Sequence, residues 1–166
     1  PVYRTEQADA AATSTKDLTL VMRIADCQPF VMYAPKHNVI GMIHAGWKGV
    51  VAGMIPAFFR KISDEWGIAP RDTFVCAGPS LCLQCAGFTD PRTELPTVDP
   101  RFFHGRFVDL RAAADAQLED AGVPKANIER SPDCTKCMHE KYWSYRSKDE
   151  KAFTENYRNM LTIRLK

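Results

Sequence analysis

The sequence predicts a mixed α+β fold in which layered mixed β-sheets are flanked by helices. Short apolar, partly β-branched runs alternate irregularly with two helical patterns, which favours this class over a barrel. The chain has 166 residues, and compact domains contain roughly 100–200 residues. We therefore expect residues 1–166 to form one domain with one hydrophobic core.

The first quarter of the chain predicts three strands, over residues 17–24, 30–34 and 39–44. Residues 35–38, with the sequence Pro-Lys-His-Asn, are typical of a tight turn. We therefore expect the second and third strands to form a hairpin.

The next segment predicts an amphipathic helix over residues 50–66, because its apolar side chains recur three and four positions apart. Pro56 should kink this helix or mark the first turn of its second half, and Gly67 should end it. A second helix should begin after the capping residue Asp109 and stop at Gly122.

The remaining segments predict shorter elements. We expect strands over residues 72–77, 127–130 and 159–165, and an irregular, proline-containing connection over residues 88–105.

The composition argues against several classes of protein. The chain has 22 Lys+Arg against 20 Asp+Glu, a formal net charge of +2, and 45% hydrophobic residues, which is unlike a disordered or nucleic-acid-binding chain. It has no apolar run as long as a membrane span. Its first residues do not have the pattern of a signal peptide, so we expect none there. We expect a cytoplasmic protein that binds neither nucleic acid nor membrane, whose six cysteines have chemical, metal-binding or packing roles rather than forming a disulfide framework.

Cys27 and His44 are the residues that point most directly to chemistry. If the predicted hairpin forms, its open end brings them together. They would then form a nucleophile and its base, or two ligands of a zinc site that keeps an open position. A buried thiol and a hydrogen-bonded imidazole without function is the third interpretation.

Several motifs occur in the order found in the laccase-domain proteins. They are Ala25-Asp26-Cys27-Gln28-Pro29, His44-Ala45-Gly46-Trp47-Lys48-Gly49, Gly78-Pro79-Ser80 with Cys85 after it, Val108-Asp109-Leu110, Cys134-Thr135 and Ser144-Tyr145-Arg146. The chain resembles this family over nearly its whole length. Its members are called multicopper polyphenol oxidases, peptidoglycan editing factors or purine nucleoside phosphorylases.

The resemblance implies a layered fold similar to the cysteine hydrolase fold of a deamidating bacterial toxin. It also implies a metal, usually taken as zinc, on Cys27, His44 and a histidine in an earlier Val-His-Gly segment. The sequence has no Val-His-Gly and begins at Pro1 rather than Met. We therefore expect a laccase-type domain without its N-terminal segment.

Some positions depart from the pattern of the family. Lys48 replaces an arginine, and residues 84–88 and 142–147 differ from the usual Cys-Cys-Tyr-Glu-Val and Phe-Phe-Ser-Tyr-Arg-Arg. Lys48, Arg146 and Arg4 are the basic residues nearest the matching motifs, and they are candidates for binding an anionic group. Ordinary solvated charges at the surface are the alternative interpretation. Lys48 and Arg146 join Cys27 and His44 as candidate catalytic residues. The other histidines, at positions 37, 104 and 139, lie in loops and are expected at the surface.

Two Cys-x-x-Cys pairs, Cys82 with Cys85 and Cys134 with Cys137, have the pair spacing of a structural zinc site. A redox pair is a further alternative. The interval between the pairs is longer than in common zinc ribbons, which favours separate buried or loop thiols.

The resemblance implies a zinc-dependent purine nucleoside phosphorylase that acts on adenosine, inosine and methylthioadenosine with phosphate, and that also deaminates adenosine. The alternatives are a cysteine hydrolase or amidase that edits a peptidoglycan precursor with Cys27 and His44, and a binding protein without catalysis. A copper phenol oxidase fits less well, because multicopper sites need many histidines and the chain has four.

Overall fold

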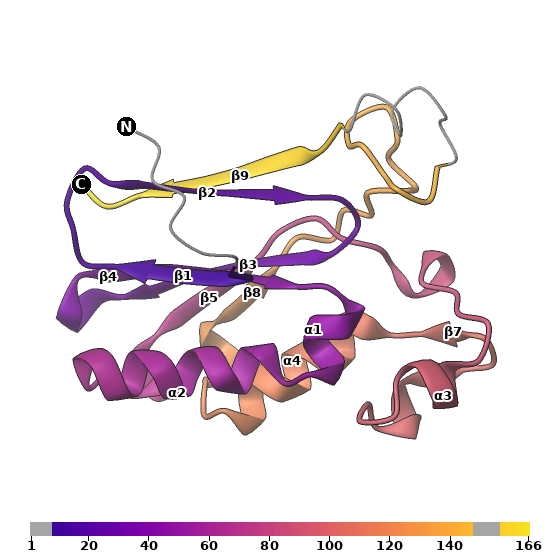
Figure 1. The fold of residues 1–166 in the computed structure, drawn as a ribbon, viewed down its shortest axis with the longest axis horizontal. Coiled ribbons are helices and arrows are strands. Elements are labelled where there is room, and N and C mark those ends of the chain that lie inside the picture. Colours follow the sequence, from indigo (N-terminus) through magenta and orange to yellow (C-terminus); the bar gives the residue numbers. More distant parts are fainter. Residues whose placement is uncertain (1–7, 148–156) are drawn as a thin grey trace.

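The computed structural model describes residues 8–147 and 157–166 and shows a layered α+β architecture (Figure 1). The strands are β1 (Ala10–Thr13), β2 (Thr19–Ile24), β3 (Gln28–Ala34), β4 (Val39–Ala45), β5 (Phe74–Ala77), β6 (Phe103–His104), β7 (Phe107–Val108), β8 (Ile128–Arg130) and β9 (Asn159–Arg164). The α-helices are α1 (Trp47–Val51), α2 (Met54–Trp66), α3 (Pro91–Glu94) and α4 (Leu110–Asp120). The predicted fold class is confirmed.

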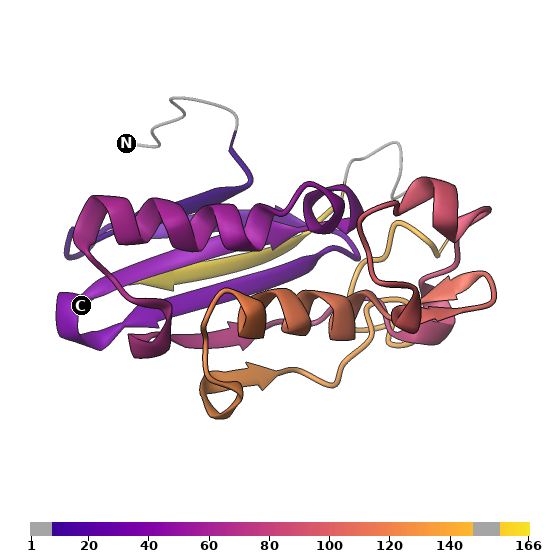
Figure 2. The ribbon, with the colours of Figure 1, turned by 90° about the horizontal axis from the view of Figure 1, so that it is seen from below.

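The central sheet has five strands in the order β1-β4-β3-β5-β8. Its neighbouring strands are antiparallel except for β5 and β8, which run parallel, so the sheet is mixed as predicted. Helices α2 and α4 cover one face, and the antiparallel pair β2–β9 lies over the other (Figures 1 and 2). Because both faces of β3 and β4 are covered, these strands are buried along most of their length.

The hydrophobic core fills the space between the central sheet and the helices α2 and α4. Phe58 and Phe59 of α2 are buried and pack edge to face with ring centroids 5.5 Å apart. Gly41 of β4 faces the Phe58 ring, and a Cβ at this position would come within 2.6 Å of Phe58 Cζ. The missing side chain therefore lets α2 pack closely on the sheet. None of the helices in the described ranges has the length and apolar character of a membrane span.

Strand β1 was not predicted, because it consists of three alanines and a threonine, and alanine has little preference for strands. Its pairing with β4, with Ala10 opposite Ile43, is a tertiary effect that the local sequence does not reveal. The predicted hairpin is confirmed as β3 and β4, and Asn38 adopts the left-handed conformation in the turn.

The prediction of one helix over residues 50–66 was wrong at its N-terminal end. The chain forms α1 and α2 instead, separated at Gly53, which has a φ of 70°. A left-handed residue cannot continue a right-handed helix. Pro56 lies in the first turn of α2, where its missing N–H costs no helical hydrogen bond. Gly67 ends α2 as predicted.

The later predictions hold with changes at the element ends. Asp109 caps α4 by accepting a hydrogen bond from the Ala112 N–H at 3.0 Å, and β5, β8 and β9 occupy most of the residues predicted for them. The stretch over residues 88–105 is not wholly irregular. It contains α3 and β6, which pairs with β7.

The sheet register brings four chain segments to one edge. β3 begins where β4 ends, with Gln28 opposite Ala45. β5 runs antiparallel to β3 and parallel to β8, so both β5 and β8 end at this same edge, with Ala77 opposite Phe30 and Arg130. Residues just before β3 and just after β4, β5 and β8 therefore lie close together.

Candidate active site

The hairpin brings Cys27 and His44 together at this edge. Cys27 immediately precedes β3, and His44 lies opposite Pro29 in the register. Both side chains lie beside Gly46, and the Cys27 side chain is close enough to the His44 imidazole to be the largest cause of its raised pKa. The pair thus has the contact that either a nucleophile with its base or two ligands of one metal would need.

Gly46 leaves the space that the Cys27 thiol occupies. A Cβ at position 46 would lie 2.9 Å from Cys27 Sγ and 3.9 Å from His44 Cε1. Gly46 has an extended backbone, with φ −66° and ψ 168°, that any residue can adopt. Its small size, rather than its conformational freedom, is therefore what the site requires.

Asp9 is a member of the site that the sequence did not reveal. Because β1 pairs with β4, Asp9 lies beside His44, and its backbone oxygen accepts a hydrogen bond from the His44 N–H at 2.7 Å. The Asp9 carboxylate lies 2.9 Å from His44 Nδ1. A carboxylate on Nδ1 selects the tautomer that carries the proton there, which leaves the Nε2 lone pair for a ligand or a proton.

The pKa of His44 is raised to about 9. The hydrogen bond with the Cys27 side chain is the largest cause, burial opposes it, and the hydrogen bond with Asp9 adds to it. Without a metal, the site therefore favours a protonated His44 beside Cys27. A metal ion would have to displace this proton in order to bind the imidazole.

Asp26 fastens the segment before Cys27 to a distant part of the chain. It is buried, with a φ of 71°. Its carboxylate accepts hydrogen bonds from Thr135 Oγ1 at 2.7 Å and from the Arg146 backbone N–H at 3.1 Å. These contacts fix the residue that adjoins Cys27 to the segment that carries Arg146.

The two predicted cations lie at opposite ends of a row of aromatic contacts. Lys48 Nζ lies 5.4 Å from the ring centroid of Trp47, whose ring packs edge to face on Phe88 at 6.0 Å. The Arg146 guanidinium lies 5.6 Å from the Phe88 ring and donates to the Gly87 carbonyl at 2.6 Å. Lys48 is exposed and Arg146 half-buried. Arg4 lies outside the described residues.

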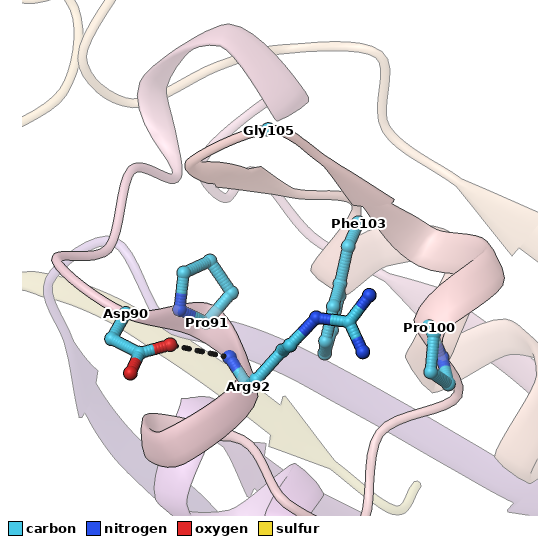
Figure 3. Close-up of a pocket in the computed structure, with 6 residues that line it drawn as sticks. All are labelled: Asp90, Pro91, Arg92, Pro100, Phe103 and Gly105. Carbon is cyan, nitrogen blue, oxygen red and sulfur yellow. Dashed lines mark hydrogen bonds between the residues drawn. The ribbon is translucent and has the colours of Figure 1, made fainter.

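A pocket of about 360 Å³ lies away from these residues, between α3 and β6 (Figure 3). It is lined by Asp90, Pro91, Arg92, Pro100, Phe103 and Gly105. The Arg92 side chain extends across it towards Phe103 (Figure 3). The four predicted catalytic residues, Cys27, His44, Lys48 and Arg146, do not line this pocket. His37, His104 and His139 are exposed, as expected.

Comparison with known proteins identifies the family. The model of the multi-copper polyphenol oxidoreductase laccase family matches residues 2–161. The chain belongs to this laccase-domain family. The resemblance inferred from the motifs is thereby confirmed.

Curated relatives of this laccase-domain chain have enzyme names. A purine nucleoside phosphorylase from Bacteroides thetaiotaomicron is 31% identical over 151 residues, which cover 83% of this chain and 55% of the relative. Adenosine deaminase RL5, from an unknown prokaryotic organism, is 29% identical over 92% of this chain and 63% of its own length. The chain thus spans between about half and two thirds of these relatives.

Solved structures of laccase-domain proteins share the fold. The hypothetical protein YfiH of Bacillus licheniformis matches with a TM-score of 0.83 and 26% identity, over 95% of this chain and 61% of that one. YlmD of Geobacillus stearothermophilus matches with a TM-score of 0.77 and 30% identity, over 84% of this chain and 56% of that one.

Proposed function

We propose that this chain forms the zinc-binding part of an enzyme that acts on purine nucleosides. The reaction proposed is phosphorolysis of adenosine, inosine and methylthioadenosine, with deamination of adenosine as a second activity. The contact between Cys27, His44 and Asp9 carries this proposal, and the names of the relatives supply the substrate class. The cytoplasm is the proposed location.

Cys27 and His44 are residues of the kinds that zinc prefers, but a catalytic zinc site needs one more protein ligand. A thiol and an imidazole are preferred zinc ligands, and a carboxylate on the far ring nitrogen is the usual support of a histidine ligand. Catalytic zinc sites have three protein ligands. The third is proposed to be the Val-His-Gly histidine that the resemblance implies, outside this sequence.

The bound metal would supply a Lewis acid that lowers the pKa of water, which deamination of adenine requires. Asp9 holds the His44 ring in the orientation and tautomer that ligation needs. Cys27 provides the second ligand. The adjoining residue Asp26 is held in place by the hydrogen bonds that its carboxylate accepts from Thr135 and Arg146.

Phosphorolysis makes a different demand, because phosphate replaces the base at C1′ of the ribose. Lys48 and Arg146 are proposed to hold the phosphate. Their contacts with Trp47 and Phe88 order the two cations on one connected set of side chains. Arg146 has less freedom than Lys48, because its backbone N–H and guanidinium are both hydrogen-bonded.

The test measures zinc and catalysis together in the full-length protein. We expect stoichiometric zinc, and release of adenine and ribose 1-phosphate from adenosine that depends on added phosphate. His44→Ala should lose the site zinc and activity together, while the exposed control His37→Ala should keep both. Full zinc and full activity in His44→Ala would contradict the proposal.

The contact of Asp9 with His44 also favours a second function. Cys27, His44 and Asp9 follow the order of nucleophile, base and orienting carboxylate that cysteine hydrolases use. Fast alkylation of Cys27 in metal-free protein, with amidase activity that survives a chelator, would favour this hydrolase over the zinc enzyme. A copper oxidase has less support, because the other three histidines are exposed.

A further inference from the structure

Four of the six cysteines form a cluster that does not include Cys27. Cys82 and Cys85 follow β5, and Cys134 and Cys137 follow β8. The four Sγ atoms all lie within 4.8 Å of one another. All four thiols are free, and the printed separations of 3.9 Å from Cys82 to Cys137 and 3.6 Å from Cys85 to Cys137 are far from the S–S bond of about 2.05 Å in a disulfide.

We propose that Cys82, Cys85, Cys134 and Cys137 bind one structural zinc ion as a closed four-thiolate site. Tetrahedral zinc with Zn–S bonds of about 2.3 Å places its sulfur ligands about 3.8 Å apart. The two sulfur separations of 3.9 and 3.6 Å lie on either side of this value. An iron–sulfur cluster would distribute the four thiolates over several iron atoms and hold them farther apart.

A backbone donor beside Cys134 favours a thiolate. The Cys82 N–H donates to Cys134 Sγ at 3.3 Å. Such N–H···S bonds stabilise the charged sulfur that a metal needs.

The position of the cluster explains what the zinc would do. Residues 131–147 contain neither a helix nor a strand. Arg111 of α4 joins the loops after β5 and β8, because it donates to the carbonyls of Leu81 and Pro132. Thr135, between the second pair of cysteines, holds Asp26. The zinc would therefore hold in place the segment that carries Thr135, and through it Asp26, the residue before Cys27.

The experiment separates this site from the candidate active site. Full-length Cys27→Ala protein, purified without chelators and under reducing conditions, removes a ligand of the other site and keeps the cluster. We expect one zinc per chain by elemental analysis. Adding Cys137→Ala should remove this zinc, whereas Cys76→Ala, at an exposed cysteine of β5, should retain it.

Cobalt replacement provides a second measurement that does not depend on the folding of the Cys137→Ala variant. Cobalt bound by the Cys27→Ala protein should show the intense visible bands and sulfur charge-transfer absorption of a tetrahedral four-thiolate site. A protein that takes up neither zinc nor cobalt, with these four thiols freely titratable, would overturn the proposal. Iron as the resident metal would overturn the assignment to zinc.

Discussion

Gly46→Ala should damage the candidate active site through steric contact alone. The added Cβ would lie 2.9 Å from Cys27 Sγ, whereas non-bonded heavy atoms rest at about 3.5–4.0 Å. The thiol or the backbone must therefore move by roughly 0.6–1.1 Å. A displacement of about 1 Å in a catalytic group can lower the rate about 100-fold. We expect kcat/KM to fall about 10- to 100-fold.

Gly49→Ala is the matched control. A Cβ at this position in α1 would lie 3.5 Å from the His44 carbonyl oxygen and 3.6 Å from Met54 Cβ, which are ordinary contacts. Alanine is favoured over glycine inside a helix by about 0.5–1 kcal/mol, so Tm should hold or rise.

The assay compares kcat/KM for adenosine phosphorolysis, zinc affinity and Tm in the two variants. A Gly46→Ala protein with wild-type zinc affinity and wild-type kcat/KM would refute the reasoning, because it would show that neither function needs the thiol in its present position. Equal losses in both variants would refute it too.

Three further substitutions test the supports of the site. Asp9→Ala removes the hydrogen-bond partner of His44, so zinc affinity should fall about 10- to 100-fold in a competition titration; unchanged affinity would count against the orienting role. Asp26→Ala leaves the Thr135 hydroxyl without its acceptor and the Arg146 N–H with Ser144 Oγ alone, and should lower the free energy of unfolding in urea by about 1–3 kcal/mol. Arg146→Lys should raise KM for phosphate about tenfold, equivalent to about 1.4 kcal/mol, and an unchanged KM would exclude a phosphate contact.

The sequence predicted the part of the site that depends on local pattern. A turn between two apolar runs was enough to predict the β3–β4 hairpin, and the hairpin was enough to predict that Cys27 and His44 meet. The roles of these two residues stay predictions. The helix after β4 was also recognisable from its apolar spacing, although the break at Gly53 was not.

Asp9 could not be assigned a role from the sequence, because its place depends on β1. The alanines of β1 carry no strand signal, and the strand is defined by its pairing with β4. The short carboxylate contact to His44 follows from that register. A long-range pairing of this kind is decided by tertiary packing, which a pattern of neighbouring residues does not record.

The two Cys-x-x-Cys pairs are a second feature whose contact depends on long-range strand pairing and could not be predicted from the local sequence. Their long interval is unlike that of a zinc ribbon, in which both pairs lie in a short local unit. Here the interval contains a crossover with α4, and parallel strands require such a crossover. Because β5 and β8 are parallel neighbours, the loops after them leave the same edge of the sheet, and the two pairs meet there. The long interval between the pairs, which argued against a shared site, is thus explained by the crossover between β5 and β8.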